Sequence, residues 1–405
     1  MNTLRIPAFR NLLIGATLSQ LGDVCFSIAL PWLVLQMTGS GIALGSILVA
    51  LAIPRGALML FGGALSDRVS ARTILIFSNL ALTLCVAAVA FLAAHHALAL
   101  WMLYVVAIVF GVADAFANPA TKVLIPGIVP RDDIAAANSL LQSSTQLCML
   151  GGAAAAGLLI QHFGMVSAFT VDAFSFVFLI FALLSITAPA AARVQTNGLL
   201  AAIREGIAYV AQEPSLRMLL LVIASVNFCL TGATQVGIVT LVHARFGSAG
   251  TFGALVTVTA IGSLVGLLLA GVWKRRRNML LDILGGASLL GVCLASLAIR
   301  LPFAFIFVAL AASGAIAGYL NVYILSELQR SVSPTMLGRV MSLVTLSSVG
   351  IAPISLALSG VIAQSHVELL FALAGCALIA VSLIGAPLTY KSLRHSRSIA
   401  LNTKP

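Results

Sequence analysis

Long apolar segments recur almost from end to end of this 405-residue chain, and they constrain its fold more than any other feature. Hydrophobic residues make up 61% of the sequence and charged residues only 8%, with a mean hydropathy of +1.12. A transmembrane helix needs about 20 mostly apolar residues, and the segments have that length. They lack the alternation of apolar and polar residues that marks barrel strands. The sequence therefore predicts an all-α integral membrane protein.

We predict twelve membrane-spanning helices. Most of the links between them are short, so consecutive helices run antiparallel, and an even number of helices puts both termini on one side of the membrane. The predicted spans cover residues 9–36, 42–65, 72–94, 98–123, 137–161, 165–188, 216–242, 250–273, 279–299, 302–327, 336–363 and 367–389.

The placement of Lys and Arg predicts the orientation of these helices. In a soluble protein, the net charge of +11 would suggest a nucleic-acid partner, but here the basic residues lie in the short links. Links rich in Lys and Arg stay on the cytoplasmic side of a membrane. With a cytoplasmic N-terminus, the inner side collects nearly all basic residues, whereas the outer side keeps only Arg245 and Arg300. We therefore expect both termini in the cytoplasm and no nucleic-acid partner.

The longest link divides the chain into two sets of six spans. Apolar residues recur in it at helical spacing beside Arg204 and Glu205, which predicts an amphipathic helix on the inner membrane surface. A disordered linker is the alternative interpretation. The predicted parts are a first six-helix half at 1–188, the linker at 189–215, a second six-helix half at 216–390 and a basic cytoplasmic tail at 391–405.

The two halves resemble one another in sequence. Gly111 and Asn118 stand seven residues apart in the fourth span, as do Gly314 and Asn321 in the tenth. Asn118 and Asn321 therefore have equivalent places in two six-helix pseudo-repeats. We regard both asparagines as candidates for lining a substrate cavity, with interhelical hydrogen bonding as an equal alternative.

The link between the second and third spans carries the most specific motif in the chain. It runs Gly-Gly-Ala-Leu-Ser-Asp-Arg-Val-Ser-Ala-Arg over residues 62–72. This stretch resembles the signature loop of the major facilitator superfamily, roughly Gly-x-Leu-x-Asp-Arg-x-Gly-x-Arg, although Ser70 stands where glycine is usual. The matching positions are Gly63, Leu65, Asp67, Arg68 and Arg72.

Other short stretches resemble a bacterial branch of that superfamily, which includes macrolide-efflux and enterobactin-export proteins. The resemblance covers nearly the whole chain. It implies two parallel six-helix repeats with a substrate site near the bilayer midplane, and a secondary exporter in the bacterial inner membrane. One departure is that Ala153 follows Gly152 where the branch often has a Gly-Pro pair. The stretches include Leu21-Gly22-Asp23, Asn118-Pro119-Ala120 and Gly338-Arg339-Val340-Met341-Ser342.

Asp67, at the cytoplasmic end of its helix, is the best-supported gating candidate. It could face the start of the eleventh span, where free N–H groups and the helix dipole attract a carboxylate and where Arg339 would add a salt bridge. The resemblance implies that this contact latches the two halves closed on the inside. Ordinary helix capping is the alternative for Asp67, and a role in topology alone is the alternative for Arg68 and Arg72.

Charged residues inside the predicted spans need an explanation, because a charge at a helix centre costs about 2.5–3.5 kcal/mol. Asp23 lies about 20 Å into the first span at 1.5 Å per residue. We interpret it as a carboxylate that exchanges protons, or alternatively as a permanently paired residue that fixes the first helix. Arg55 and Asp114 lie about 13–15 Å from the cytoplasmic ends of their helices. This similar depth would allow a pair, either a structural bridge or a gate, and both residues are also candidates for proton coupling. Asp172, near the outer end of its span, is expected to have an interfacial or packing role.

The sequence lacks the motifs of an ATPase or an enzyme. It has no Walker-type Gly-Lys-Ser/Thr run, no nucleophile elbow, no HExxH helix and no cofactor motif, and its six cysteines match no metal-site spacing. We therefore expect no enzyme, cofactor or metal, and an ion gradient, most simply protons, as the energy source.

These features together predict a monomeric secondary transporter in contact with membrane lipid. It would export a drug-like or siderophore-like small molecule in exchange for protons by alternating access. The alternatives are an uptake symporter of the same fold and a non-transporting membrane sensor or assembly component.

Overall fold

The computed structural model describes residues 3–66, 69–186, 199–272, 279–300 and 302–402, and twelve of its helical segments are long and apolar enough to cross a membrane. No strand occurs among these residues. The prediction of an all-α protein with twelve spans is therefore confirmed. The helices are α1 (Pro7–Thr38), α2 (Gly41–Ser66), α3 (Ala71–Ala94), α4 (Leu100–Ile128), α5 (Ile134–Phe163), α6 (Met165–Leu184), α7 (Leu199–Gln212), α8 (Pro214–Gly232), α9 (Ile238–Arg245), α10 (Ala249–Val272), α11 (Met279–Ser296), α12 (Phe303–Ser331), α13 (Pro334–Ser365) and α14 (Val367–Asn402).

Three features of these helices extend what the sequence predicts. The seventh span consists of α8 and α9 joined by a π-helical turn at Ala233–Gly237, a local irregularity that often marks functional positions in helices. Helix α7 lies within the predicted linker, and α14 continues to Asn402 through most of the predicted tail. The attachment of α7 to the membrane surface stays a prediction.

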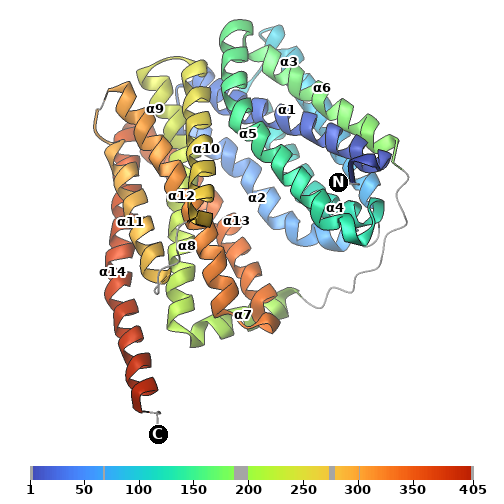
Figure 1. The fold of residues 1–405 in the computed structure, drawn as a ribbon. Helices are drawn as coiled ribbons and strands as arrows, with labels where there is room; N and C mark the ends of the chain where they lie inside the picture. The colour runs from blue at the N-terminus through green and yellow to red at the C-terminus, as the bar shows by residue number, and fades with distance from the viewer. Residues whose placement is uncertain (1–2, 67–68, 187–198, 273–278, 301, 403–405) are drawn as a thin grey trace. The chain divides into compact units, whose positions relative to one another are not determined.

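The helices form two compact units (Figure 1). The first unit contains Met1–Thr196 together with Ile238–Thr257, a segment from the second half of the chain, and the second unit contains the remaining residues. In the first unit, α1 packs against α5 and α6, α2 packs against α4, and α3 packs against α4 and α6. In the second unit, α8 packs against α13, α11 against α12 and α14, and α7 against α13.

Helix α1 organises the first unit. It begins at Pro7, whose fixed φ suits the first turn of a helix, and it ends at Gly39, which has a φ of +61° and donates its N–H to the Leu35 carbonyl. A left-handed residue at this place favours glycine. The helix is one of the longest in the chain, and its N-terminal end carries Phe9 and Leu12 into an apolar core.

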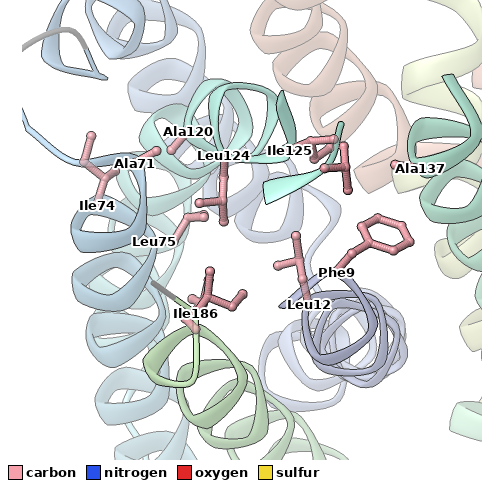
Figure 2. Close-up of a cluster of buried hydrophobic side chains, with 12 residues drawn as sticks. Phe9, Leu12, Ala71, Ile74, Leu75, Ala120, Leu124, Ile125, Ala137 and Ile186 are labelled. Carbon is pink, nitrogen blue, oxygen red and sulfur yellow. The ribbon is translucent and has the colours of Figure 1, made fainter. Parts of the chain in front are cut away.

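That core lies where α1, α3 and α5 begin and where α4 and α6 end (Figure 2). Alternating helix direction brings these five ends to the same side of the unit. Its buried side chains fix the helix ends that would stand near one membrane surface, and they leave the middle of the bundle to the polar residues described below. The core consists of Phe9, Leu12, Ala71, Ile74, Leu75, Ala120, Leu124, Ile125, Val129, Ala137, Leu183 and Ile186.

Glycines bring helices into close contact in the same way in both units. Gly111 of α4 lies against the backbone carbonyl of Leu51 in α2, and Gly314 of α12 lies against the carbonyl of Thr259 in α10. A side chain at either glycine would overlap the facing backbone, so only glycine permits this approach. The two glycines that stand at equivalent places in the sequence repeat therefore make equivalent contacts.

Candidate functional site

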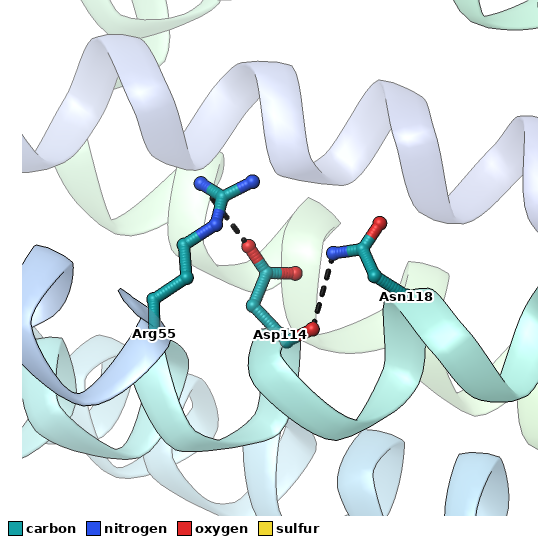
Figure 3. A network of polar contacts seen from close by, with 3 residues as sticks. All are labelled: Arg55, Asp114 and Asn118. Carbon is teal, nitrogen blue, oxygen red and sulfur yellow. Dashed lines mark hydrogen bonds and ion pairs between the residues drawn. The ribbon is translucent and has the colours of Figure 1, made fainter. Parts of the chain in front are cut away.

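Arg55 and Asp114 form an ion pair near the middle of α2 and α4. Arg55 Nη1 lies 3.4 Å from Asp114 Oδ2 (Figure 3). The packing of the two helices explains the pair, because Asp114 follows Gly111 by one turn and Arg55 follows Leu51 by one turn, and residues three or four apart lie on one helix face. The close contact at Gly111 therefore carries the two side chains toward each other.

The surroundings of this ion pair indicate contact with water rather than lipid. The side chains of Arg55 and Asp114 are 46% and 41% exposed, although both residues stand well inside hydrophobic helices. Charged groups in spanning helices face the bundle interior or an aqueous cavity because exposure to hydrocarbon is costly. This face of the first unit is therefore suited to line a water-filled space.

Asn118 belongs to the same polar surface. It follows Asp114 by one turn on α4, and its Nδ2 donates a hydrogen bond of 3.1 Å to the Asp114 backbone carbonyl (Figure 3). The Asn118 side chain is exposed. Asn321, its sequence equivalent, is exposed on α12 in the second unit. Both positions are compatible with lining a cavity, which stays a prediction.

Two further carboxylates join the ion pair into a network. Asp23, near the middle of α1, is half-buried and interacts electrostatically with Asp114 and Arg55. Asp172 of α6 interacts electrostatically with Asp23. Three carboxylates and one guanidinium, from α1, α2, α4 and α6, are thus linked in series by electrostatic interactions. One cation cannot neutralise three ionised carboxylates, so this network is suited to hold protons.

Asp172 lies near the beginning of α6, at the end predicted from the sequence to face the outside. Its side chain is fully buried, with 0% exposure, and its carboxylate faces Gly22 of α1. Of the two roles expected from the sequence, interfacial or packing, complete burial favours packing. Gly15 faces Ala182 while Gly22 faces Asp172 and Ser175, so the antiparallel α1 extends past the end of α6 and brings its own midpoint beside Asp172.

The Arg55–Asp114 pair has no counterpart at the equivalent places of α10 and α12. The glycine contacts align Gly314 with Gly111 and Thr259 with Leu51. One turn further on, where the first unit has Asp114 and Arg55, the second unit has Ala317 and Ser263. The two halves therefore share this close helix packing but not this ion pair.

The structure describes only part of the predicted gating motif. Gly63 lies in α2, whereas Asp67 and Arg68 lie outside the described residues, as does the expected contact between Asp67 and α13. Arg72 donates from Nε to the Leu183 carbonyl at 2.8 Å and from Nη2 to the Leu184 carbonyl at 2.9 Å. It therefore caps the C-terminal end of α6, where carbonyl groups lack helical partners.

Arg339 contacts the helix in the linker. Its Nη1 lies 2.7 Å from Glu205 Oε2 on α7, and the two side chains are 40% and 52% exposed. This ion pair ties the beginning of α13 to α7. Sequence reasoning named both residues but did not predict their pairing.

A hollow of about 330 Å³ lies in the first unit where α1 ends and α6 begins. Trp32, Gln36, Gln161 and Ser248 contribute its larger or polar side chains, and no ionisable side chain occurs among its described lining residues. It is therefore separate from the carboxylate network. Among the described residues, no group of three or more His, Cys, Asp or Glu side chains is arranged to hold a metal ion.

Nearly the whole chain is similar to known membrane transporters. A family model described as "Transmembrane secretion effector" matches residues 1–404. The MFS-type transporter y4rN of Sinorhizobium fredii is 27% identical over 386 residues, which cover 92% of each chain. The multidrug efflux pump Tap of Mycolicibacterium fortuitum is 27% identical over 377 residues, which cover 90% of this chain and 91% of Tap.

Solved structures share the fold at lower sequence identity. A bacterial homologue of the iron transporter ferroportin has a TM-score of 0.75 and 15% identity, over 96% of this chain and 100% of that chain. The nucleoside transporter NupG has a TM-score of 0.72 and 12% identity, over 95% of this chain and 99% of that chain. At these identities, the likeness concerns the twelve-helix architecture alone.

Proposed function

Because this chain belongs to the transmembrane secretion effector family of major facilitator superfamily transporters, we propose that it exports a drug-like small molecule in exchange for protons. Membership in a transporter family confirms that the chain is a multi-pass membrane transporter and not an enzyme. We further propose that it works as a monomer in the bacterial inner membrane with both termini in the cytoplasm, as the Lys and Arg placement favours.

The similarity to Tap supports export over uptake, since Tap is a multidrug efflux pump and aligns over nearly its whole length. The family match also favours transport over the alternative of a non-transporting sensor. A siderophore-like compound stays a second substrate class in this proposal, because the same resemblance covers macrolide-efflux and enterobactin-export proteins.

One observation carries the proposal of proton coupling: the half-exposed Arg55–Asp114 pair stands inside the membrane-spanning part of the chain and adjoins Asp23. Chains of carboxylates at this depth are typical of proton relays in transporters. We assign proton exchange with the cavity to Asp23. Arg55 then provides a positive charge that stabilises Asp23 after it has lost its proton, and Asp114 shares that charge.

The available energy is sufficient for efflux. One charge that crosses the membrane releases about 2.3 kcal/mol per 100 mV. Since about 1.4 kcal/mol corresponds to a factor of ten, one proton per cycle at 100 mV sustains about a 40-fold gradient of a neutral substrate.

The test uses inside-out vesicles that contain this protein and have an acidified lumen. A panel of drug-like compounds and siderophores is added outside, and a pH-sensitive dye follows the lumenal pH. We expect an exported compound to raise the lumenal pH, and we expect the response to disappear in Asp23→Asn. Asp132→Asn, an exposed residue in the link before α5, is the matched control and should respond like the wild type.

Each other outcome contradicts a part of the proposal. Accumulation of a compound without proton movement would refute proton coupling. Proton efflux that occurs only when the compound is loaded inside the lumen would identify an uptake symporter. A full response in Asp23→Asn would move the coupling to another residue.

A further inference from the structure

Asp172 is a buried aspartate. The proton exchange proposed for Asp23 does not by itself require it. Neither of its carboxylate oxygens has a hydrogen-bond partner within the described part of the chain, and its side chain has 0% exposure. Ser175, one turn further along α6, donates its hydroxyl to the Asp172 backbone carbonyl at 2.7 Å and not to the carboxylate. A buried structural carboxylate usually accepts hydrogen bonds, and the Asp172 carboxylate accepts none from the described residues.

The cost of burial indicates that Asp172 carries a proton in this conformation. An ionised carboxylate without hydrogen bonds or a paired cation is far more costly to bury than its neutral acid. Arg55, the cation of the network, is paired with Asp114. A protonated Asp172 needs neither a countercharge nor the multiple donors that a carboxylate demands.

The groups that face Asp172 leave Asp23 as its proton partner. Among the described residues, the ionisable groups of α1 that interact with Asp172 are Asp23 and Cys25. Arg72 of α3 is bonded to carbonyls at the opposite end of α6. The remaining ionisable side chains on the helices packed against α6 are Arg10 on α1, Cys85 on α3, and Cys148 and His162 on α5. Arg10 stands at the start of α1, beyond Gly15, which faces Ala182 near the other end of α6.

Gly22 makes the approach of Asp23 and Asp172 possible. A methyl group at Gly22 would lie 2.7 Å from Asp172 Oδ1 and would overlap Ser175 Oγ. The absence of a side chain at Gly22 therefore lets α1 and α6 pack closely. The next residue on α1 is Asp23, which interacts electrostatically with Asp172.

Exposure drops at the last step of the network, between Asp23 and Asp172. The Asp114 side chain is 41% exposed, Asp23 is half-buried, and Asp172 is fully buried. A proton from water can therefore reach Asp172 by way of Asp23, because Asp23 interacts both with Asp172 and with the half-exposed Arg55–Asp114 pair.

We propose that Asp172 is the proton-storage residue of the first unit and that it exchanges its proton with Asp23. In the transfer, the O–H bond of the Asp172 carboxylic acid breaks and an O–H bond forms on Asp23, so Asp172 becomes the carboxylate and Asp23 the neutral acid. The reverse transfer leaves the negative charge on Asp23, next to Arg55. The role of this storage in transport rests on the proposed proton coupling, but the proton itself is detectable without a substrate.

Infrared difference spectroscopy of the purified protein in liposomes tests this proposal. A protonated carboxylic acid has a carbonyl stretch that is well separated from the carboxylate bands, and the stretch shifts in D₂O as the proton exchanges. We expect one slowly exchanging band in the wild type and its loss in Asp172→Asn. We expect Asp23→Asn to keep the band but to slow its exchange at least tenfold, because the route to water passes through Asp23. Asp132→Asn should match the wild type.

Three results would overturn the proposal: no slowly exchanging acid in the wild type, a band that survives in Asp172→Asn, or unchanged exchange in Asp23→Asn. If Asp172→Asn does not fold, the exchange rate in Asp23→Asn still decides the question. A protein that shows the expected spectra but moves no protons in the vesicle assay would refute the proposed antiport and leave the stored proton in place, so the two failures are distinguishable.

Discussion

Neutralisation of Arg55 should destabilise the first unit more than neutralisation of Asp114. At 3.4 Å, two unit charges attract by about 5 kcal/mol at an effective dielectric constant of about 20 and by about 1.2 kcal/mol in bulk water. Because both side chains are about half exposed, we expect Asp114→Asn to lower the free energy of unfolding by about 1–3 kcal/mol. Arg55→Met should cost more, since it leaves both Asp114 and Asp23 without their cation.

A double-mutant cycle measures this coupling. Unfolding by SDS in mixed micelles can be followed with a thiol-reactive dye, because Cys25, Cys148 and Cys229 are buried and free in the folded protein. We expect the double variant to be more stable than the sum of the single losses predicts, with an interaction energy of about 1–2 kcal/mol. The Arg300–Glu368 ion pair is the matched control, because the Arg300 side chain is 86% exposed and its neutralisation should leave stability close to that of the wild type.

Two results would contradict this reasoning. Additive losses, with an interaction energy below about 0.3 kcal/mol, would mean that the pair contributes no mutual stabilisation. A smaller loss for Arg55→Met than for Asp114→Asn would mean that Arg55 does not serve Asp23 as well as Asp114.

Five further substitutions test three other contacts, at Gly111, Arg72 and Arg339. Gly111→Ala should destabilise the protein by about 1–3 kcal/mol, because the added methyl group meets backbone that cannot move freely. Gly151→Ala is the control and should not destabilise the protein, because no atom lies within 4 Å of the added methyl group. Denaturation curves of the two variants compare them directly. Arg72→Leu should cost about 1.5–3 kcal/mol for each charge-assisted hydrogen bond that is lost, and hydrogen exchange should rise at the last turn of α6; unchanged protection there would contradict the capping role. Arg339→Gln and Glu205→Gln should expose α7 to proteolysis to the same extent, because each breaks the same ion pair. Each should change the free energy of unfolding by at most about 1 kcal/mol. Different protease sensitivities of the two variants would argue against the pairing of Arg339 with Glu205.

The pairing of some charged residues could be predicted from their distances to the ends of their own helices. Arg55 and Asp114 stand at similar distances from the ends of two helices that run in the same direction, so their pairing followed from counting residues. The same count placed Asp172 near one end of α6 but could not show that its side chain packs against Gly22 at the middle of α1. Depth along one helix predicts a neighbour only when both helices end at the same level.

Other contacts had no signal in the sequence. Arg72 and Leu183 are 111 residues apart, and the ion pair of Arg339 with Glu205 joins a span to the linker helix. Many surface arrangements of a long basic side chain satisfy the same local pattern. The orientation of each helix about its own axis selects among them, and that orientation depends on packing against several neighbours.

The sequence by itself determined the class of protein, the number of spans and the predicted topology. In a bilayer, every backbone N–H and C=O group must be bonded within its own segment or to a neighbouring strand, so the length of an apolar run is enough to specify a helix. Tertiary structure decided which polar side chains meet. The close approach at Gly111 brings Asp114 beside Arg55, and the one at Gly22 brings α1 against Asp172. Such an arrangement depends on distances between helices that no single segment encodes.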